Sequence, residues 1–190
     1  MKKVVVLMGA LLLSSACGKD SSDDIPAVPQ QSPAAQPSPE KSAEDVATLR
    51  NYELTMEKLD QVFRAQMNLV TAIAALTPAE RQAMEAASAT RPEDGLDEVI
   101  GRLDSNAVAK KAVTDAGITT RDYITASMAL MQASMAWSVI QSRPGENQDS
   151  LSLMMDANPA NVRFVRDNMA ELTRRQEQMS AEMSRRGLAQ

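Results

Sequence analysis

Apolar residues recur at alternating intervals of three and four along two long stretches of the chain. The first set is Leu49, Tyr52, Met56, Leu59, Phe63, Val70 and Ile73, and the second is Val162, Val165, Met169, Leu172, Met179 and Met183. This spacing places each set on one face of an α-helix. We therefore expect one long amphipathic helix that ends near Leu76. A second should run from Asn158-Pro159, a helix start, to the basic stop Arg185-Arg186-Gly187.

A third long segment, from Tyr123 to Ser142, carries no charged residue. At about 100° per residue, its methionines, including Met131 and Met135, share one face with Ile124, and four alanines lie opposite. Four serines, two glutamines and a threonine make the segment too polar for a membrane span. It therefore predicts the central helix of a bundle, packed on all sides, with Met131 in the core.

Local start and stop signals predict shorter helices between these segments. Thr77-Pro78-Ala79-Glu80 combines a capping threonine, a proline at the first helical position and a glutamate that completes a capping box. The periodicity of 96–103 and 106–116 predicts two more short helices, the second ended by Gly117. Thr119 is expected to cap the uncharged helix. The stretch 143–157 is expected to form a break followed by a polar loop.

Together these segments predict an all-α fold, a helical bundle of three long helices plus two or three short ones after a disordered tether. Aromatic residues make up only 3% of the chain, which is low for a β-sandwich, and the 44% hydrophobic content is sufficient for one core. We place the single domain at residues 43–190. Residues 17–42 form the tether, because 18–42 hold five of the nine prolines among Ser, Gln and Asp.

The chain begins with Lys2 and Lys3, followed by the uncharged run Val4–Ala16. Such a run is too short to span a bilayer and is typical of a secretory signal peptide. It ends in Leu11-Leu12-Leu13-Ser14-Ser15-Ala16-Cys17, with the single cysteine of the chain at its end. In these residues the chain resembles a bacterial lipoprotein precursor, with Ser14 in the place where that family usually has leucine.

The resemblance implies that residues 1–16 are removed between Ala16 and Cys17, and that Cys17 then carries acyl chains such as palmitate. Several acyl chains bind a membrane stably, so the anchor would hold the domain in the cell envelope. Gly18 rather than aspartate follows Cys17, and this favours the outer membrane over the inner membrane. The alternative is an ordinary secreted protein without a lipid.

The absence of histidine excludes His-containing catalytic triads and His–metal sites, and the lone cysteine excludes an intrachain disulfide. The net charge is −5, and the arginines are scattered among acidic residues, so no nucleic acid is expected as a partner. We interpret Arg174, Arg175, Arg185 and Arg186 as a solvated helix end. The acidic group Glu93, Asp94, Asp97 and Glu98 lacks the ligand spacing of an EF-hand. No cofactor or metal is expected.

Three functions agree with this reading. The leading hypothesis is a non-catalytic, lipid-anchored module of the cell envelope that binds or scaffolds a protein partner. The alternative is a carrier of a small apolar ligand, in a pocket lined by methionine, serine and Trp137. The third is an enzyme that acts on peptidoglycan with a carboxylate pair, although no acidic residue stands in an apolar run that would raise its pKa.

One glutamine interrupts the apolar pattern of each amphipathic helix, Gln66 in the first and Gln176 in the second. A buried unpaired amide costs about 1 to 3 kcal/mol, so an antiparallel pairing that joins both amides in one layer would satisfy them. We therefore name Gln66 and Gln176 as a candidate polar core layer. In that register Phe63 would lie near Met179.

Overall fold

The computed structural model describes residues 39–88 and 95–188. Every regular element in these two ranges is an α-helix, which confirms the predicted all-α class. The helices are α1 (Pro39–Asn51), α2 (Met56–Ala75), α3 (Pro78–Ser88), α4 (Leu96–Ser105), α5 (Ala107–Thr114), α6 (Thr120–Ser142), α7 (Gln148–Met154), α8 (Pro159–Asp167) and α9 (Met169–Arg185). Helix α1 begins at Pro39, so the helical part starts four residues before the predicted boundary at residue 43.

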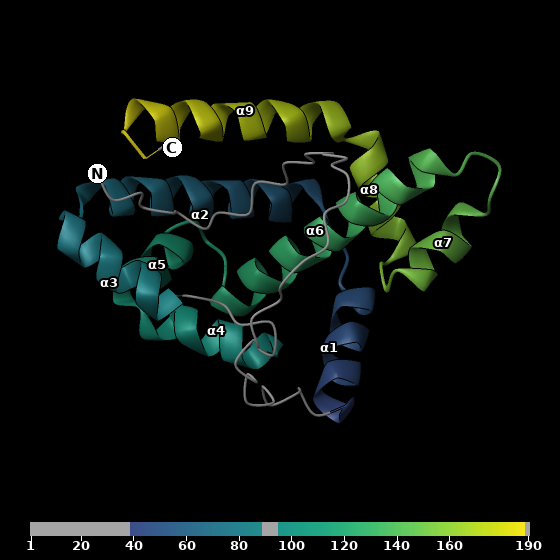
Figure 1. The fold of residues 1–190 in the computed structure, drawn as a ribbon, viewed down its shortest axis with the longest axis horizontal. Helices are drawn as coiled ribbons and strands as arrows, with labels where there is room; N and C mark the ends of the chain where they lie inside the picture. The colour runs from purple at the N-terminus through teal and green to yellow at the C-terminus, as the bar shows by residue number, and fades with distance from the viewer. Residues whose placement is uncertain (1–38, 89–94, 189–190) are drawn as a thin grey trace, which may run out of the picture.

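Helix α6 runs through the middle of the bundle (Figure 1) and packs against α1, α2, α4, α5, α7 and α8. Its first half shares a hydrophobic core with α1, α2 and α5, which includes Val62, Val113 and Ala126. Its second half shares another core with α7 and α8, which includes Ala133 and Val165. The predicted central position of the uncharged segment is therefore confirmed. Within the described residues, no helix combines the length and the apolarity needed to cross a bilayer.

The orientation of α6 differs from the prediction. The alanine face is buried, with Ala133 and Ala136 both 0% exposed, whereas Met131 is 50% exposed and Met135 is 46% exposed. Alanine lets neighbouring helix backbones come close, so the bundle packs around this face and leaves the longer methionine side chains outside. The expectations that this segment is packed on all sides and that Met131 lies in the core were therefore wrong.

The first amphipathic stretch is two helices rather than one. The chain leaves the helix after Asn51, and Thr55 caps the start of α2 by accepting a hydrogen bond from the backbone N–H of Lys58. Between them, the backbone N–H of Leu54 donates to Oδ1 of Asn161 at 2.9 Å, and Nδ2 of Asn161 donates to the carbonyl of Tyr52 at 2.8 Å. A side chain from α8 thus satisfies the backbone groups that a continuous helix would have paired internally.

The second amphipathic stretch is also divided, into α8 and α9. Asn168 ends α8 with φ −114° and ψ 14°, and its side chain donates to the carbonyl of Phe164 at 2.8 Å. Within 143–157, where a polar loop was expected, α7 forms instead, capped by Asn147. Helix α7 is amphipathic enough to bury Leu151 against the second core.

The local start and stop predictions are confirmed. The backbone N–H of Thr77 donates to Oε2 of Glu80 at 2.7 Å, and the backbone N–H of Glu80 donates back to Oγ1 of Thr77 at 3.3 Å. Thr119 accepts from the backbone N–H of Asp122 at 3.0 Å at the start of α6. Gly117 has φ +79°, a left-handed conformation that glycine adopts at little cost after a helix.

Candidate functional site

The residues predicted for lipid attachment, Ala16 and Cys17, lie outside the described part of the chain. The predicted polar layer is not formed. Gln176 is exposed, and α2 and α9 run in the same direction in Figure 1 rather than antiparallel. Gln66 is half-buried beside Tyr123. Burial raises the pKa of Tyr123, and a hydrogen bond with the Gln66 side chain offsets part of this rise. Among the described residues, the buried Oε1 of Gln66 finds no hydrogen-bond partner.

An ion pair, rather than a pair of amides, sets the alignment of α9 on α2. Nη2 of Arg175 lies 2.5 Å from Oδ1 of Asp60, and Nε of Arg175 donates to Oε1 of Glu171 at 2.6 Å. The guanidinium is also 5.4 Å from the centre of the Phe63 ring, and the Arg175 side chain is only 15% exposed. Hydrogen bonds from Arg174 and Arg175 lower the pKa of Glu171 to about 2. The Arg175–Asp60 pair thus joins α9 to α2, and Leu172 packs α9 against the second core, although α9 has no fully buried residue.

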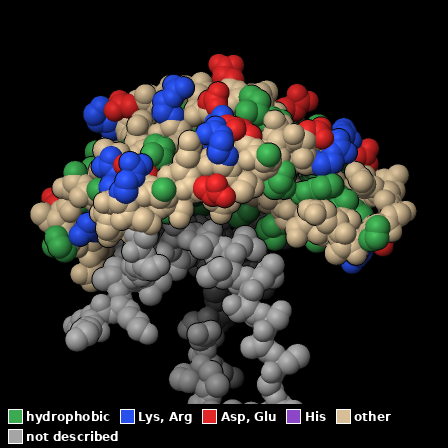
Figure 2. Space-filling model, turned by 90° about the horizontal axis from the view of Figure 1, so that it is seen from above, with side chains coloured by type: hydrophobic (Ala, Val, Ile, Leu, Met, Phe, Trp, Pro, Cys, Tyr) green, Lys and Arg blue, Asp and Glu red, His purple; other side chains and the backbone are tan. Residues whose placement is uncertain are grey.

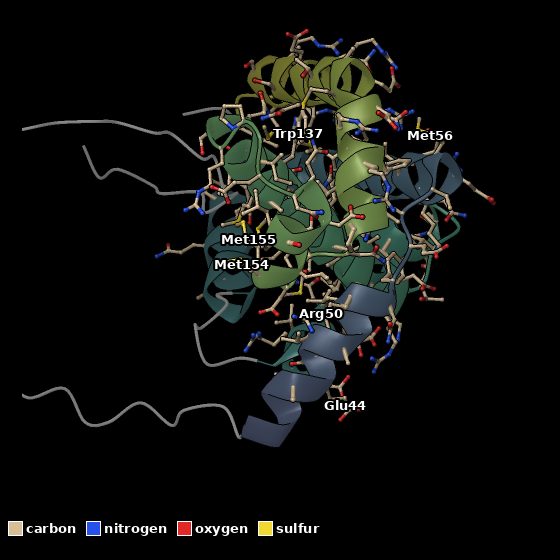
Figure 3. All side chains as sticks on the ribbon, turned by 90° about the vertical axis from the view of Figure 1, so that its right-hand side faces the viewer. Glu44, Arg50, Met56, Trp137, Met154 and Met155 are labelled. Atoms are coloured by element: carbon tan, nitrogen blue, oxygen red, sulfur yellow. The ribbon has the colours of Figure 1, made fainter. Side chains whose placement is uncertain are left out.

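Four large apolar side chains stand out from the surface of α6 and α7. We call them the methionine surface: Met131 (50% exposed), Met135 (46%), Leu153 (50%) and Met154 (76%). Figure 3 places Met154 beside Met155 on the end of the molecule that also carries Trp137, and both Trp137 and Met155 pack against the second core. In Figure 2, hydrophobic side chains are exposed on the right-hand side of the view, the side on which Figure 1 places α7.

The surroundings of the methionine surface are charged but internally paired. Arg50 of α1 forms an ion pair with Asp156 and donates to the carbonyl of Leu153 at 3.2 Å, and Arg163 forms an ion pair with Asp149. These contacts tie both ends of α7 to neighbouring helices, so the exposed apolar side chains stand on a fixed element. Exposed apolar side chains beside charged ones, as on α7, are typical of protein-binding surfaces.

A second feature is a groove between α2 and α9, with a volume of about 410 Å³. We call it the arginine groove; its lining residues are Phe63, Arg64, Met67, Arg174, Arg175, Gln178, Ala181 and Arg185. The interpretation of these arginines as a solvated helix end holds only in part. Arg185 and Arg186 do pair with Glu182 in the last turn of α9. Arg174 and Arg175 lie in its first half and face α2 across the groove.

The other predicted sites find less support. A second, more open hollow of about 590 Å³ lies beside α4, α5 and the start of α6. The apolar-carrier hypothesis requires a pocket lined by methionine, serine and Trp137. Neither hollow has Trp137 or a serine in its lining. Asp104 is the single carboxylate among their lining residues, and hydrogen bonds from Thr120 and Lys110 lower its pKa, which is unsuitable for a general acid. Within 39–88 and 95–188, no three acidic or cysteine side chains are grouped to hold a metal ion.

Searches against protein-family models, curated proteins and solved structures find no match to this chain.

Proposed function

We propose that this protein is a lipid-anchored module of the cell envelope that binds a protein partner through the methionine surface. The observation that supports the proposal is the exposure of Met131, Met135, Leu153 and Met154 on two packed helices. Methionine is flexible and polarizable, and it adapts to the shape of a bound partner. Burial of such side chains in an interface is favourable by about 25 cal/mol per Å² of apolar surface.

The anchoring part of the proposal is supported by the sequence. The segment that ends in Cys17 resembles a lipoprotein signal, and the Pro-rich stretch after it would serve as a spacer between the lipid and the helical domain. We favour the outer membrane as the site of attachment. A tethered domain searches for partners along one surface, so a moderate affinity of the methionine surface is sufficient at the raised local concentration.

The proposal is tested with a photoreactive amino acid at position 135 or 154 of the full chain, expressed in bacteria that process lipoproteins. Val108, which is 37% exposed on α5 outside the methionine surface, supplies the control position. We expect one discrete adduct from Met135 and Met154 and none from Val108. The double change Met131→Gln and Leu153→Gln should abolish the adduct while the helical circular dichroism is unchanged.

Two results would contradict the proposal. Equal adducts from all three positions would indicate nonspecific contact, and adducts that survive the double change would place the interface elsewhere. An adduct with twice the mass of this chain would show that the partner is a second copy of the chain and not a different protein.

A further inference from the structure

The arginine groove has an arginine-rich lining, although the whole protein is acidic. Four of its eight lining residues are arginines and none is acidic, although the chain has a net charge of −5. Arg174, Arg175 and Arg185 form ion pairs with neighbouring carboxylates. Arg64 has no carboxylate partner among the described residues, so it supplies a positive charge that can attract an anion into the hollow. A hollow of this kind on an acidic protein favours a negatively charged ligand.

The ion pairs of the groove leave guanidinium donors for such a ligand. Arg174 engages Glu171 through Nε and Nη2, at 2.8 and 2.5 Å, and Nη1 of Arg174 takes no part in that pair. Among the described residues, Arg64 has no carboxylate partner, and its one hydrogen bond is a long contact of 3.4 Å from Nη1 to the carbonyl of Ala116. A guanidinium has five N–H donors, so both side chains can also bind an anionic group.

The rest of the lining is apolar. Phe63 and Met67 from α2 and Ala181 from α9 supply the hydrophobic surface between the arginines. The volume of about 410 Å³ lies within the range of small-molecule sites, about 300 to 1,000 Å³. The Arg175–Asp60 ion pair joins the α9 wall of the groove to α2. Arg175 acts here as a positioning residue.

We infer that the arginine groove binds a single-chain amphiphile with an anionic head group. The head group is held by Arg64 and Arg174, and the chain lies over Phe63 and Met67. The arginine groove and the methionine surface share no residue, so this inference does not depend on the proposed protein partner.

The test uses the full chain labelled with ¹³C at the methionine methyl groups and titrated with decanoate below its micellar concentration. The Met67 methyl group lies in the groove, and Met135 and Met154 on the methionine surface serve as internal controls. A Met67→Leu variant assigns the signal. We expect the Met67 resonance to shift with saturation, and the Met135 and Met154 resonances to stay unchanged.

Variants locate the two halves of the ligand. Arg64→Gln together with Arg174→Gln should weaken decanoate binding by about tenfold or more, because charge-assisted hydrogen bonds are lost. Ala181→Glu, at an exposed helix position, should abolish binding by filling the groove with a negative charge. Arg143→Gln changes an exposed arginine outside the groove and should leave the affinity unaltered.

Two control ligands test whether binding needs both the negative charge and the alkyl chain. Decyltrimethylammonium and acetate should each fail to saturate the Met67 shift, the first for its charge and the second for its missing chain. Equal binding of the cation, or decanoate binding unaffected by the arginine and Ala181 changes, would overturn the inference. Binding to phosphatidylglycerol vesicles without binding to monomeric decanoate would also overturn it, in favour of a membrane surface.

Discussion

Asn161 joins two parts of the chain that are more than one hundred residues apart. It is 2% exposed, accepts from the backbone N–H of Leu54 at 2.9 Å and donates to the carbonyl of Tyr52 at 2.8 Å. We predict that Asn161→Ala destabilises the protein strongly, because both backbone groups lose their buried partner. The carbonyl of Tyr52 retains a weaker bond from Asn158 at 3.3 Å, whereas the N–H of Leu54 loses its partner outright.

The expected cost follows from these contacts. An unsatisfied buried N–H costs about 1 to 3 kcal/mol and the second lost hydrogen bond about 1 kcal/mol, so the free energy of unfolding should fall by about 2 to 4 kcal/mol. Asn147→Ala is a matched control, since the Asn147 side chain accepts one hydrogen bond from the backbone N–H of Ser150 at an exposed helix start. Loss of such a cap costs typically about 1 kcal/mol.

Urea unfolding followed by circular dichroism measures both variants, with Trp137 fluorescence as a second probe. Amide hydrogen exchange adds a local test, because the Leu54 amide should exchange much faster in Asn161→Ala than in the unchanged protein. If Asn161→Ala costs no more than Asn147→Ala, or if the Leu54 amide keeps its protection, then Asn161 does not hold the connection between α1 and α2.

Three further predictions follow from the structure. Met131→Ala should change the free energy of unfolding by less than about 0.5 kcal/mol, whereas Ala133→Leu should cost about 1 to 3 kcal/mol by overpacking the core; thermal unfolding compares the two. The pKa of Glu171 is lowered to about 2, chiefly by its hydrogen bond with Arg174, so the stability it contributes is present above its ordinary pKa near 4.5 and lost as pH falls towards 2. Hydrogen exchange of α9 should therefore accelerate over this window, and less so in Glu171→Gln. Cys17→Ser should abolish incorporation of labelled palmitate and release the domain from membranes; membrane retention without label would indicate an uncleaved signal segment as the anchor.

The amino-acid sequence predicts the helical class and those helix boundaries that depend on neighbouring residues. The capping box of Thr77 and Glu80, the cap at Thr119 and the glycine stop at Gly117 all lie where their residue types place them. Each of these interactions joins residues no more than four positions apart, so the local sequence contains all the groups involved. The uncharged segment 123–142, which forms most of α6, likewise indicated its central position.

Tertiary packing, by contrast, sets the positions at which the amphipathic stretches break and the face of α6 that is buried. The contact from Leu54 to Asn161 spans 107 positions, so the residues near Leu54 do not predict it. The apolar period continues across that break, because both helices face one core. The buried face of α6 was equally undecided, since alanine and methionine are both apolar. The alanine face is buried because helix backbones approach more closely over small side chains. The methionine surface therefore stays exposed.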